Sequence, residues 1–476
     1  MRIIDLPPLA SSLTESIRDI GYSLNTAVAD IIDNSISANA KNVNVYSHED
    51  EGVKFAIIDD GIGLAEDDLI NAMRLGSQNP LEQRDLGDLG RFGLGLKTAS
   101  FSQCRKLSVV SSINGIKTGV QWDLDHISKV NKWELNVLDE NEISNLYQIN
   151  HLESDGTIVI WEKCDRIIDT TARDSTAYYE KLESLEKHLQ LIFHRFKTLK
   201  ININDKKISY FDPFVENSGA TQHLSEEVVR VNGEDVLIKP FVLPHHSKVS
   251  KEEYEYNAGE GGYLQNQGFY IYRNKRLIVH GTWMRIRPRS ELAKLTRIRI
   301  DLPNNMDHEW KIDAKKSQAI PPQVIREKLK TIVDKCIGKS KRVYTHRGKV
   351  KASIKTPYWN RSSARGKIGY QVNESHPDIK DFISSLDDNQ KKEFQSILKD
   401  VGEFFPVASL YADYGSNPRE FDNNVIDSEI EERILKDIEK YKDDFNENDF
   451  FEKYKRTEPY YFYTKSLVEF IHKNYE

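Results

Sequence analysis

The stretch "AVADIIDNSIS", residues 27–37, places three polar side chains, Asp30, Asp33 and Asn34, inside an otherwise apolar run. Apolar residues recur at helical spacing over residues 23–40, which predicts a helix there. On that helix Asp30 and Asn34 lie four residues apart and share one face. Because a buried carboxylate is costly unless it is paired or binds something, these side chains are candidates for a functional site.

An acid and an amide on one face of a helix suit a water molecule and a metal ion. The Asp30 carboxylate would orient or deprotonate the water. The amide oxygen of Asn34 is a hard ligand of the kind that binds Mg²⁺. Taken alone, this segment is explained equally well as a helix with a solvated polar stripe.

A second segment, "IIDDGIGL" at residues 57–64, ends a predicted strand in Asp59 and then turns through Gly61 and Gly63. The glycines allow the backbone to turn sharply and to approach a ligand closely. Asp59 would accept a hydrogen bond at the base of a pocket. An ordinary turn is the alternative interpretation of this short pattern.

A third segment, "GRFGLGLKTAS" at residues 90–100, combines glycines with a predicted helix start. Free backbone N–H groups and the helix dipole would attract a phosphate there. The spacing is not that of the Walker motif, and a flexible glycine hinge is the alternative. Its candidate binding residues are Gly90, Gly93, Gly95, Lys97 and Thr98.

The order and spacing of these segments, followed by "DGTIVIWE" at residues 155–162, resemble the GHKL ATPase superfamily. That group includes gyrase B, MutL, the ninety-kilodalton heat-shock chaperones, histidine kinases and MORC proteins. The resemblance covers residues 20–165. It implies an α/β fold of the Bergerat type, an α+β sandwich that binds ATP and Mg²⁺.

The resemblance also implies roles for individual residues. Asp30 matches the general base and Asn34 the Mg²⁺ ligand, while Asp59 matches the aspartate that recognises the adenine amino group. Gly61 and Gly63 would line the pocket, Thr157 would lie near the adenine, and residues 74–95 would form a lid over ATP, with Gly87 and Gly90 as hinges.

One departure concerns the base, because the family usually has glutamate where this chain has Asp30. Aspartate is shorter by one methylene group. Since a misplacement of about 1 Å can cost roughly 10²-fold in rate, we predict slow turnover. ATP binding without hydrolysis stays an open alternative.

The patterns of predicted elements and charge divide the chain into four successive segments, and the resemblance implies what the first two are. They are an ATPase domain (1–170), a transducer-like α/β domain (171–335), a basic linker or arm (336–372) and a mostly helical C-terminal region (373–476). In the second of them, "HEWKIDAKKSQAI" at residues 308–320 resembles the loop whose lysine reaches the γ-phosphate. Lys315 is the match and Lys316 the runner-up, while two lysines capping a surface loop are the alternative.

The branch of the superfamily is indicated by two stretches. "GRFGLGLKTAS" and "GFYIYRNKRLI" at residues 268–278 are most similar to MORC proteins and their bacterial relatives, and more distantly to MutL and gyrase B. MORC proteins and their bacterial relatives occur in restriction and anti-phage contexts. No histidine precedes the first motif, which argues against a histidine kinase.

Charge is distributed unevenly along the chain. Residues 326–367 contain 14 lysines and arginines against two acids, with Tyr344, Tyr358 and Trp359 among them. This pattern predicts phosphate neutralisation and base stacking on double-stranded DNA. The alternative is a solvated basic linker that docks on residues 420–476, where 16 acids face nine bases.

The remaining composition suits a protein of the cytoplasm. The 476 residues carry a net charge of −7, and the three cysteines, Cys104, Cys164 and Cys336, show no disulfide or zinc spacing. The N-terminus lacks the apolar core of a signal peptide. No stretch approaches the roughly 20 apolar residues of a membrane helix.

Together these patterns and the resemblance predict an ATP-dependent switch or clamp on DNA that hydrolyses ATP slowly. The resemblance also implies that ATP binding favours a homodimer. An effector protein, such as a nuclease, would act with it. Two alternatives remain: a chaperone-like ATPase with protein clients, and a nucleotide-gated scaffold that does not hydrolyse ATP.

Overall fold

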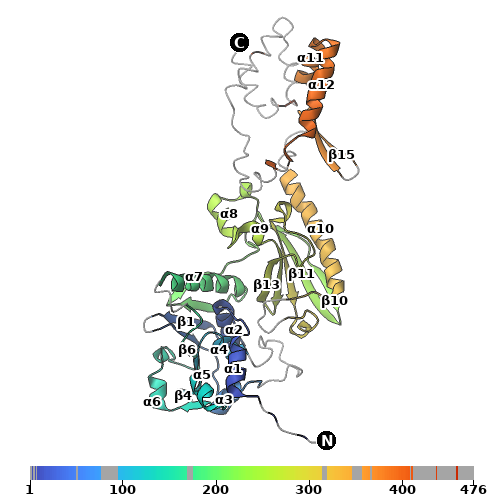
Figure 1. Cartoon of the computed structure of the whole chain (residues 1–476). Helices are drawn as coiled ribbons and strands as arrows, with labels where there is room; N and C mark the ends of the chain where they lie inside the picture. The colour runs from blue at the N-terminus through green and yellow to red at the C-terminus, as the bar shows by residue number, and fades with distance from the viewer. Residues whose placement is uncertain are drawn as a thin grey trace. The chain divides into compact units, whose positions relative to one another are not determined.

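The computed structural model describes residues 3, 6, 8–49, 52–76, 95–168, 175–312, 319–345, 356–364, 367–407, 409–410, 436 and 457–458. The chain divides into two compact units, residues 1–340 and 341–476, and the first contains two separate sheets (Figure 1).

The first sheet has eight strands in the order β5-β4-β3-β6-β2-β1-β7-β8. Neighbouring strands pair antiparallel, except that β1 and β7 are parallel. The bounds are β1 (Asn42–His48), β2 (Lys54–Asp59), β3 (Lys106–Ile113), β4 (Ile116–Asp123), β5 (Asn136–Leu138), β6 (Gly156–Glu162), β7 (Lys200–Ile203) and β8 (Lys206–Lys207).

The last two strands of this sheet come from a segment that we predicted to be part of the second domain. Val43 of β1 pairs with Ile201 of β7, and Val45 pairs with Ile203. The chain therefore leaves the first sheet only after residue 207, past the boundary predicted at residue 170. The stretch "LKININDKKISYF" at residues 199–211 predicts strand structure, and β7 and β8 lie within it, but β1, the partner of β7, lies about 160 residues away in sequence.

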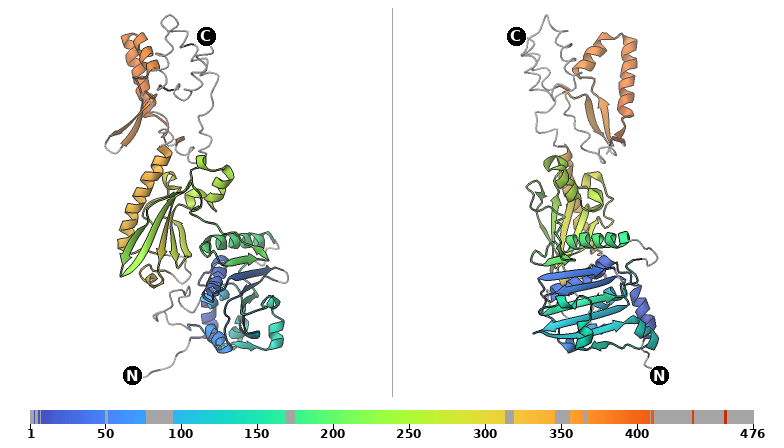
Figure 2. Two further views of the ribbon diagram at one scale, coloured as in Figure 1. Left: turned by 180° about the vertical axis from the view of Figure 1, so that it is seen from behind. Right: turned by 90° about the vertical axis from the view of Figure 1, so that its left-hand side faces the viewer.

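Successive residues of each strand face opposite sides of the sheet, and each side has its own cluster of buried residues. Ile57, Val109 and Val159 belong to the cluster that contains α2, whereas Ile58 and Val110 belong to the opposite cluster beneath α6. Figure 2 shows the sheet face-on. The helices of this part are α1 (Ala10–Arg18), α2 (Leu24–Ser37), α3 (Glu66–Met73), α4 (Gly95–Phe101), α5 (Leu124–Val130), α6 (Glu140–Ser144) and α7 (Ser175–Ile192).

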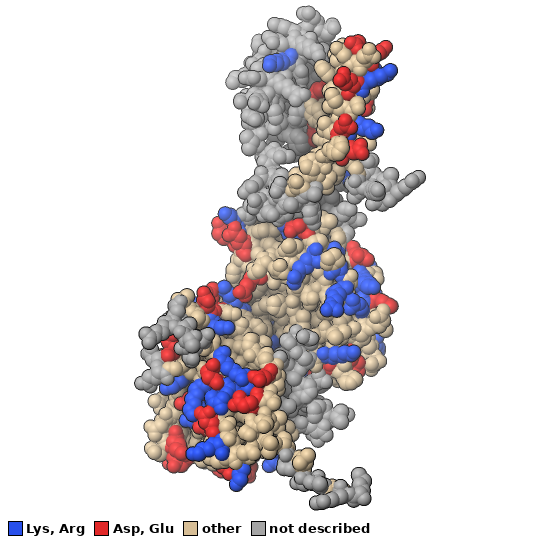
Figure 3. All heavy atoms as spheres, viewed as in Figure 1, with Lys and Arg blue, Asp and Glu red and all other residues tan. Residues whose placement is uncertain are grey.

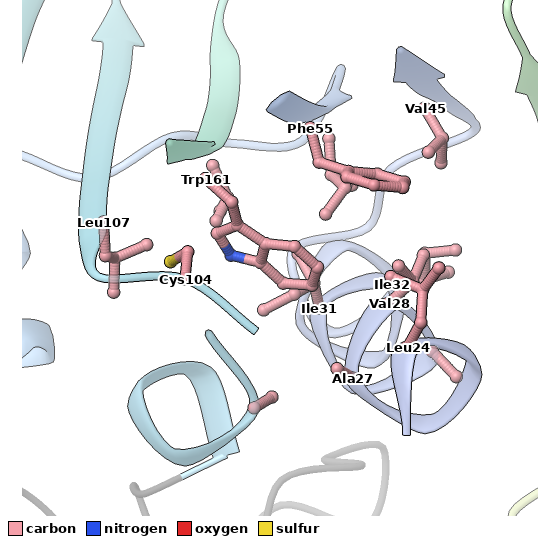
Figure 4. Close-up of a cluster of buried hydrophobic side chains, with 14 of the residues drawn as sticks. Leu24, Ala27, Val28, Ile31, Ile32, Val45, Phe55, Cys104, Leu107 and Trp161 are labelled. Carbon is pink, nitrogen blue, oxygen red and sulfur yellow. The ribbon is translucent and has the colours of Figure 1, made fainter. Parts of the chain in front are cut away.

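Helix α2 forms as predicted and begins with a capping box. The Ser23 hydroxyl accepts a hydrogen bond from the Thr26 backbone N–H, and the Thr26 hydroxyl accepts one from the Ser23 N–H, so two end groups are satisfied. Its apolar face packs on the sheet, where Val28, Ile31 and Ile32 point toward Phe55 and Trp161 (Figure 4). This packing fixes which side chains of α2 are left to face a ligand.

The second sheet has the order β10-β11-β14-β12-β13, and β9 pairs with β11. Helix α10 (Gln323–Thr345) covers one face through buried residues at helical spacing, among them Ile325, Leu329 and Ile332. The strands are β9 (Gln222–His223), β10 (Glu227–Val231), β11 (Glu234–Val242), β12 (Gly268–Arg273), β13 (Arg276–Thr282) and β14 (Thr296–Leu302). Two short helices, α8 (Lys251–Ala258) and α9 (Gly262–Gln265), precede β12.

The segment predicted as a basic linker or arm, residues 336–372, contains the end of a helix and a hairpin. Helix α10 extends into it as far as Thr345, and β15 (Trp359–Ala364) pairs antiparallel with β16 (Lys367–Val372) in the second unit. High charge hid the strand pattern, because a two-stranded hairpin needs few apolar residues. Two helices follow, α11 (Pro377–Ser385) and α12 (Asp388–Glu403).

Within the described part of the chain, no helix is both long enough and apolar enough to cross a membrane.

Candidate functional site

Helix α2 presents the acid and the amide that the sequence singled out. Asp30 is buried, and its Oδ2 accepts a hydrogen bond of 2.9 Å from the Tyr22 hydroxyl. Asn34 lies one turn further along and is exposed, although its neighbours Asp33 and Ser35 are buried. The helix therefore holds the carboxylate in a fixed, dry position and leaves the amide open to solvent.

The start of α4 lies directly beside this carboxylate. A Cβ added at Gly95 would be 3.6 Å from Asp30 Oδ2. Thr98, in the first turn, is buried, and its hydroxyl donates to the Gly95 carbonyl at 3.4 Å. The structure thus brings the third sequence segment next to the first, as the predicted site requires.

The side chain of Lys97 is turned into the protein and does not reach solvent. Its Nζ donates to the Ala72 carbonyl at 2.7 Å, at the C-terminal end of α3, and the side chain is almost fully buried. Burial lowers the pKa of Lys97 to about 8. A phosphate-binding role for Lys97 stays a prediction, and in this structure the ammonium group caps α3.

Asp59 lies at the end of β2 and is held from both sides. Its Oδ2 accepts a hydrogen bond of 2.8 Å from the Ser35 hydroxyl of α2, and its Oδ1 accepts one of 2.9 Å from the Gly61 N–H. Burial raises the pKa of Asp59, while hydrogen bonds from Ser35, Gly61 and Thr157 act in the opposite direction. The carboxylate is thus preorganised as an acceptor in a largely dry environment.

The neighbouring strand β6 closes the floor around Asp59. Thr157 is the register partner of Asp59, and its hydroxyl lies 3.1 Å from that of Ser111 on β3. Gly156 has a φ of 149°, and a Cβ there would lie 2.0 Å from the Asp59 carbonyl oxygen. A residue with a side chain could not stand at position 156 without displacing β2.

The turn after Asp59 is equally constrained. Gly63 has a φ of 70°, and a Cβ at this position would lie 2.4 Å from the Ser112 carbonyl oxygen. Leu64 N–H then donates to Ser111 Oγ at 2.8 Å. Gly63 therefore allows the turn after β2 to approach the backbone of β3 closely, whereas at Gly61 a Cβ would lie 2.8 Å from the Cβ of Ala38, just after α2.

Helix α2 joins the two halves of the site, since it carries Asp30, then Asn34 one turn further along, and directly after it Ser35, whose hydroxyl contacts Asp59. The structure thereby assembles several sequence-predicted residues around one helix: Asp30, Asn34, Asp59, Gly61, Gly63, Gly95, Thr98 and Thr157. Gly90, Gly93, Lys315 and Lys316 lie outside the described residues, as does most of the predicted lid.

Sequence reasoning missed Tyr22, Ser35, Ser111 and Gly156. Tyr22 precedes the capping residue of α2, and nothing local connects it with Asp30. Ser35 carried a usable signal, because it is a small polar residue in the apolar run that contains Asp30 and Asn34. Ser111 and Gly156 join the site only through pairing of β3, β6 and β2, which sequence spacing does not reveal.

The residues present fit a magnesium ion held jointly with a phosphate ligand. Within the described ranges, no group of three or more His, Cys, Asp or Glu side chains is placed to hold a metal ion. Mg²⁺ in nucleotide sites uses few protein ligands and completes its shell with phosphate oxygens and water. The exposed amide of Asn34, one turn from the fixed Asp30, is suited to such a site.

Comparison with known proteins agrees with this geometry. Residues 22–157 match the family model described as "Histidine kinase-, DNA gyrase B-, and HSP90-like ATPase". Over 96 residues, 20% of this chain, the sequence is 28% identical to ATPase morc-1 of Caenorhabditis elegans, and the match spans 11% of that protein's length.

These matches confirm the resemblance predicted from the motifs. The first sheet and its helices form a GHKL-type ATPase domain of the Bergerat type, distantly similar to a MORC ATPase. A second domain with a mixed sheet follows it.

Proposed function

We propose that this chain binds ATP with Mg²⁺ at α2, hydrolyses it slowly, and uses the cycle as a switch on double-stranded DNA. The observation that carries the proposal is the arrangement around α2, where a fixed buried carboxylate, an exposed amide and a preorganised acceptor at Asp59 lie along one helix. The family match over residues 22–157 supports an ATPase at this position.

The chain's own residues account for the chemistry as follows. Asp30 orients a water molecule or takes its proton, and Tyr22 keeps the carboxylate in place. Asn34 would ligate Mg²⁺, which when bound neutralises phosphate charge. Asp59 accepts a hydrogen bond from the adenine amino group, and Thr157 lies near the adenine. Gly61 and Gly63 line the pocket and allow the adenine to approach the backbone closely.

GHKL ATPases typically dimerise, so we propose that ATP binding favours a homodimer. Lys315 would report the γ-phosphate to the second domain, and an effector protein such as a nuclease would respond, with an anti-phage role as the cellular setting. The energy for switching comes from different affinities of two conformations for ATP and ADP.

The DNA part of the proposal rests on residues 326–367. On the face shown in Figure 3, lysines and arginines of the ATPase domain lie among acidic side chains. The ion pairs of this domain agree with that view, since Arg105 pairs with Asp125 at 2.6 Å and with Glu15 at 3.3 Å. That face is therefore not basic as a whole. The 14 basic residues between 326 and 367 are the concentration of positive charge that suits a phosphate backbone.

Asn34→Ala should weaken ATP binding in the presence of Mg²⁺ by at least about tenfold, a loss of roughly 1.4 kcal/mol. The reason is that the variant loses a metal ligand, whereas an exposed substitution of this kind leaves folding nearly unchanged. Titration with a fluorescent ATP analogue, with Mg²⁺ and with EDTA, measures the effect. The two proteins should bind alike in EDTA, and an unchanged Mg²⁺ dependence in the variant would rule out the metal role.

DNA binding should weaken by about 10³-fold or more between 50 and 200 mM salt if six or more phosphates are contacted. Substituting Lys349, Lys351 and Lys355 together by Glu should abolish most of this affinity. Fluorescence anisotropy of a labelled duplex measures both. A matched control changes three exposed lysines of α12, namely Lys391, Lys392 and Lys399, to Glu, which alters net charge equally and should leave binding intact.

The proposal as a whole is tested by steady-state ATP hydrolysis with and without double-stranded DNA. Turnover that is slow and stimulated by DNA supports the switch. Turnover that ignores DNA but responds to unfolded protein would favour the chaperone-like alternative. ATP binding with no turnover in any sample would favour the nucleotide-gated scaffold.

A further inference from the structure

Asp33 lies on α2 between Asp30 and Asn34, and its carboxylate is paired with an arginine of the second sheet. Arg276 Nε donates to Asp33 Oδ1 at 2.9 Å. The two side chains are 4% and 1% exposed, so this is a fully buried ion pair. Because a buried charge without its partner is strongly destabilising, each of the two residues fixes the position of the other.

Arg276 is itself held rigidly. It is the first residue of β13, after a two-residue turn in which Asn274 and Lys275 have φ values of 47° and 70°, as a type I′ hairpin turn requires. Arg276 Nη1 donates to the Leu277 carbonyl at 2.5 Å, and its guanidinium lies 5.0 Å from the ring centre of Phe193, just after α7. Movement of Arg276 therefore requires movement of the hairpin.

The charge on Asp33 is offset by Arg276 and not by the nearby histidine of α7. Burial, together with the positive charge of Arg276, lowers the pKa of His188 to about 3, although Asp33 acts in the opposite direction. His188 is therefore neutral near pH 7. The electrostatic link between α2 and the second sheet runs through the guanidinium.

The same hairpin also holds the segment that leads to the predicted γ-phosphate lysine. Arg273, the last residue of β12, donates from Nε to Asp307 Oδ1 at 2.8 Å, and both residues are buried. Asp307 follows the short helix Asn304–Met306 and precedes residues 313–318. The four residues "RNKR" at 273–276 thus tie α2 on one side to Asp307 on the other.

We propose that the Asp33–Arg276 pair is the positioning contact that couples the nucleotide site on α2 to the second sheet. The inference rests on the proposed function, because it requires ATP to bind beside Asp30 and Asn34. These residues and Asp33 lie within about one and a half turns of one helix, so a shift of α2 displaces Asp33 with them. A buried ion pair tolerates little change in geometry, and the β12–β13 hairpin must follow.

The test is hydrogen exchange of residues 268–282 with and without Mg²⁺ and the non-hydrolysable analogue AMP-PNP. In the wild type, AMP-PNP should slow exchange there by about fivefold or more, the lower end of typical coupling between sites. The double variant Asp33→Asn/Arg276→Gln removes both charges, so that neither is left unpaired. It should bind AMP-PNP with near wild-type affinity and lose the slowing at 268–282.

A matched control removes a different ion pair of the same sheet, the one that Arg299 of β14 forms with Glu216 at 2.6 Å. The variant Arg299→Gln/Glu216→Gln should keep the response to AMP-PNP. If the Asp33/Arg276 double variant does not fold, Arg276→Lys replaces it, because lysine keeps the charge but loses the planar guanidinium. It should reduce the slowing at 268–282.

Two results would overturn the inference while leaving the proposed function standing. One is a wild type that binds AMP-PNP without any change at residues 268–282. The other is a double variant, or Arg276→Lys, that keeps the full response. A wild type that does not bind AMP-PNP at all would instead overturn the proposed function and, with it, the coupling.

Discussion

Asp30→Ala should reduce ATP turnover by about 10²- to 10⁴-fold, the range that a positioned general base contributes. The carboxylate is buried, held at 2.9 Å by the Tyr22 hydroxyl, and adjacent to Gly95 at the start of α4. A base dissolved in the solvent cannot replace Asp30, because a side chain held in position acts at a far higher effective concentration than a free molecule. Steady-state phosphate release, measured with and without double-stranded DNA, gives the rate.

The matched control is Asp30→Asn, which keeps the shape of the side chain and an oxygen that can accept from Tyr22. Both variants should bind ATP nearly as well as the wild type and lose turnover together, because the negative charge is what activates water. Turnover equal to the wild type in both variants would mean that another group is the base. Loss of turnover in the alanine variant alone would indicate packing instead.

Asp59→Asn should weaken ATP binding by about 10- to 150-fold, as expected for the loss of a charged hydrogen bond of roughly 1.5–3 kcal/mol. In the wild type, Ser35 and Gly61 already donate to the two carboxylate oxygens, which leaves acceptor lone pairs for an adenine amino group. An amide in its place turns one of those acceptors into a donor. Affinities for ATP and GTP, measured side by side, report the loss of discrimination.

The neighbouring acid Asp60 provides the control for Asp59. Its carboxylate is exposed and accepts from the backbone of Lys41 and Asn42, away from the floor formed by β6. Asp60→Asn should therefore leave ATP affinity and discrimination unchanged. If Asp59→Asn keeps normal discrimination between ATP and GTP, the assignment of the adenine pocket is incorrect.

The pH dependence follows from the raised pKa of Asp59, which is caused chiefly by burial. Protonation of Asp59 turns one of its two carboxylate oxygens into an O–H donor, which cannot accept a hydrogen bond from the adenine amino group as the charged carboxylate does. As pH falls, ATP affinity should consequently begin to drop at a pH above the usual range of an aspartate. Titrations of ATP binding across this pH range measure the effect, and Asp59→Asn should lack this component.

The helix, the two glycine turns and the type of domain were predictable because each depends on neighbours in sequence. A helical period and glycines after a strand are local signals, and α2 and the turn after β2 formed where they indicated. The hairpin turn at Asn114–Gly115 is of the same kind, with φ values of 53° and 79°. The order of these local signals identified the ATPase domain.

The structure differs from the sequence-based predictions in two strand pairings. Residues 200–207 alternate correctly but join β1 of the first sheet. Residues 359–372 were interpreted as a charged arm and form a hairpin. For residues 200–203 the partner, β1, depends on the packing of the whole domain rather than on local sequence. For residues 359–364 the partner is the next strand, β16, and the strands themselves were not predicted from the sequence.

The sequence alone predicted which residues of the ATPase domain are candidates for its chemistry, because their identity and spacing are local properties of one helix and of glycine-containing segments. Only the tertiary structure decided what holds them. Tyr22 on Asp30, Ser35 on Asp59 and Arg276 on Asp33 are contacts between segments 8, 24 and 243 residues apart. Such contacts arise because burial removes water, so that each polar group must find a partner inside the fold. The spacing of residues along the chain does not specify which partner that is.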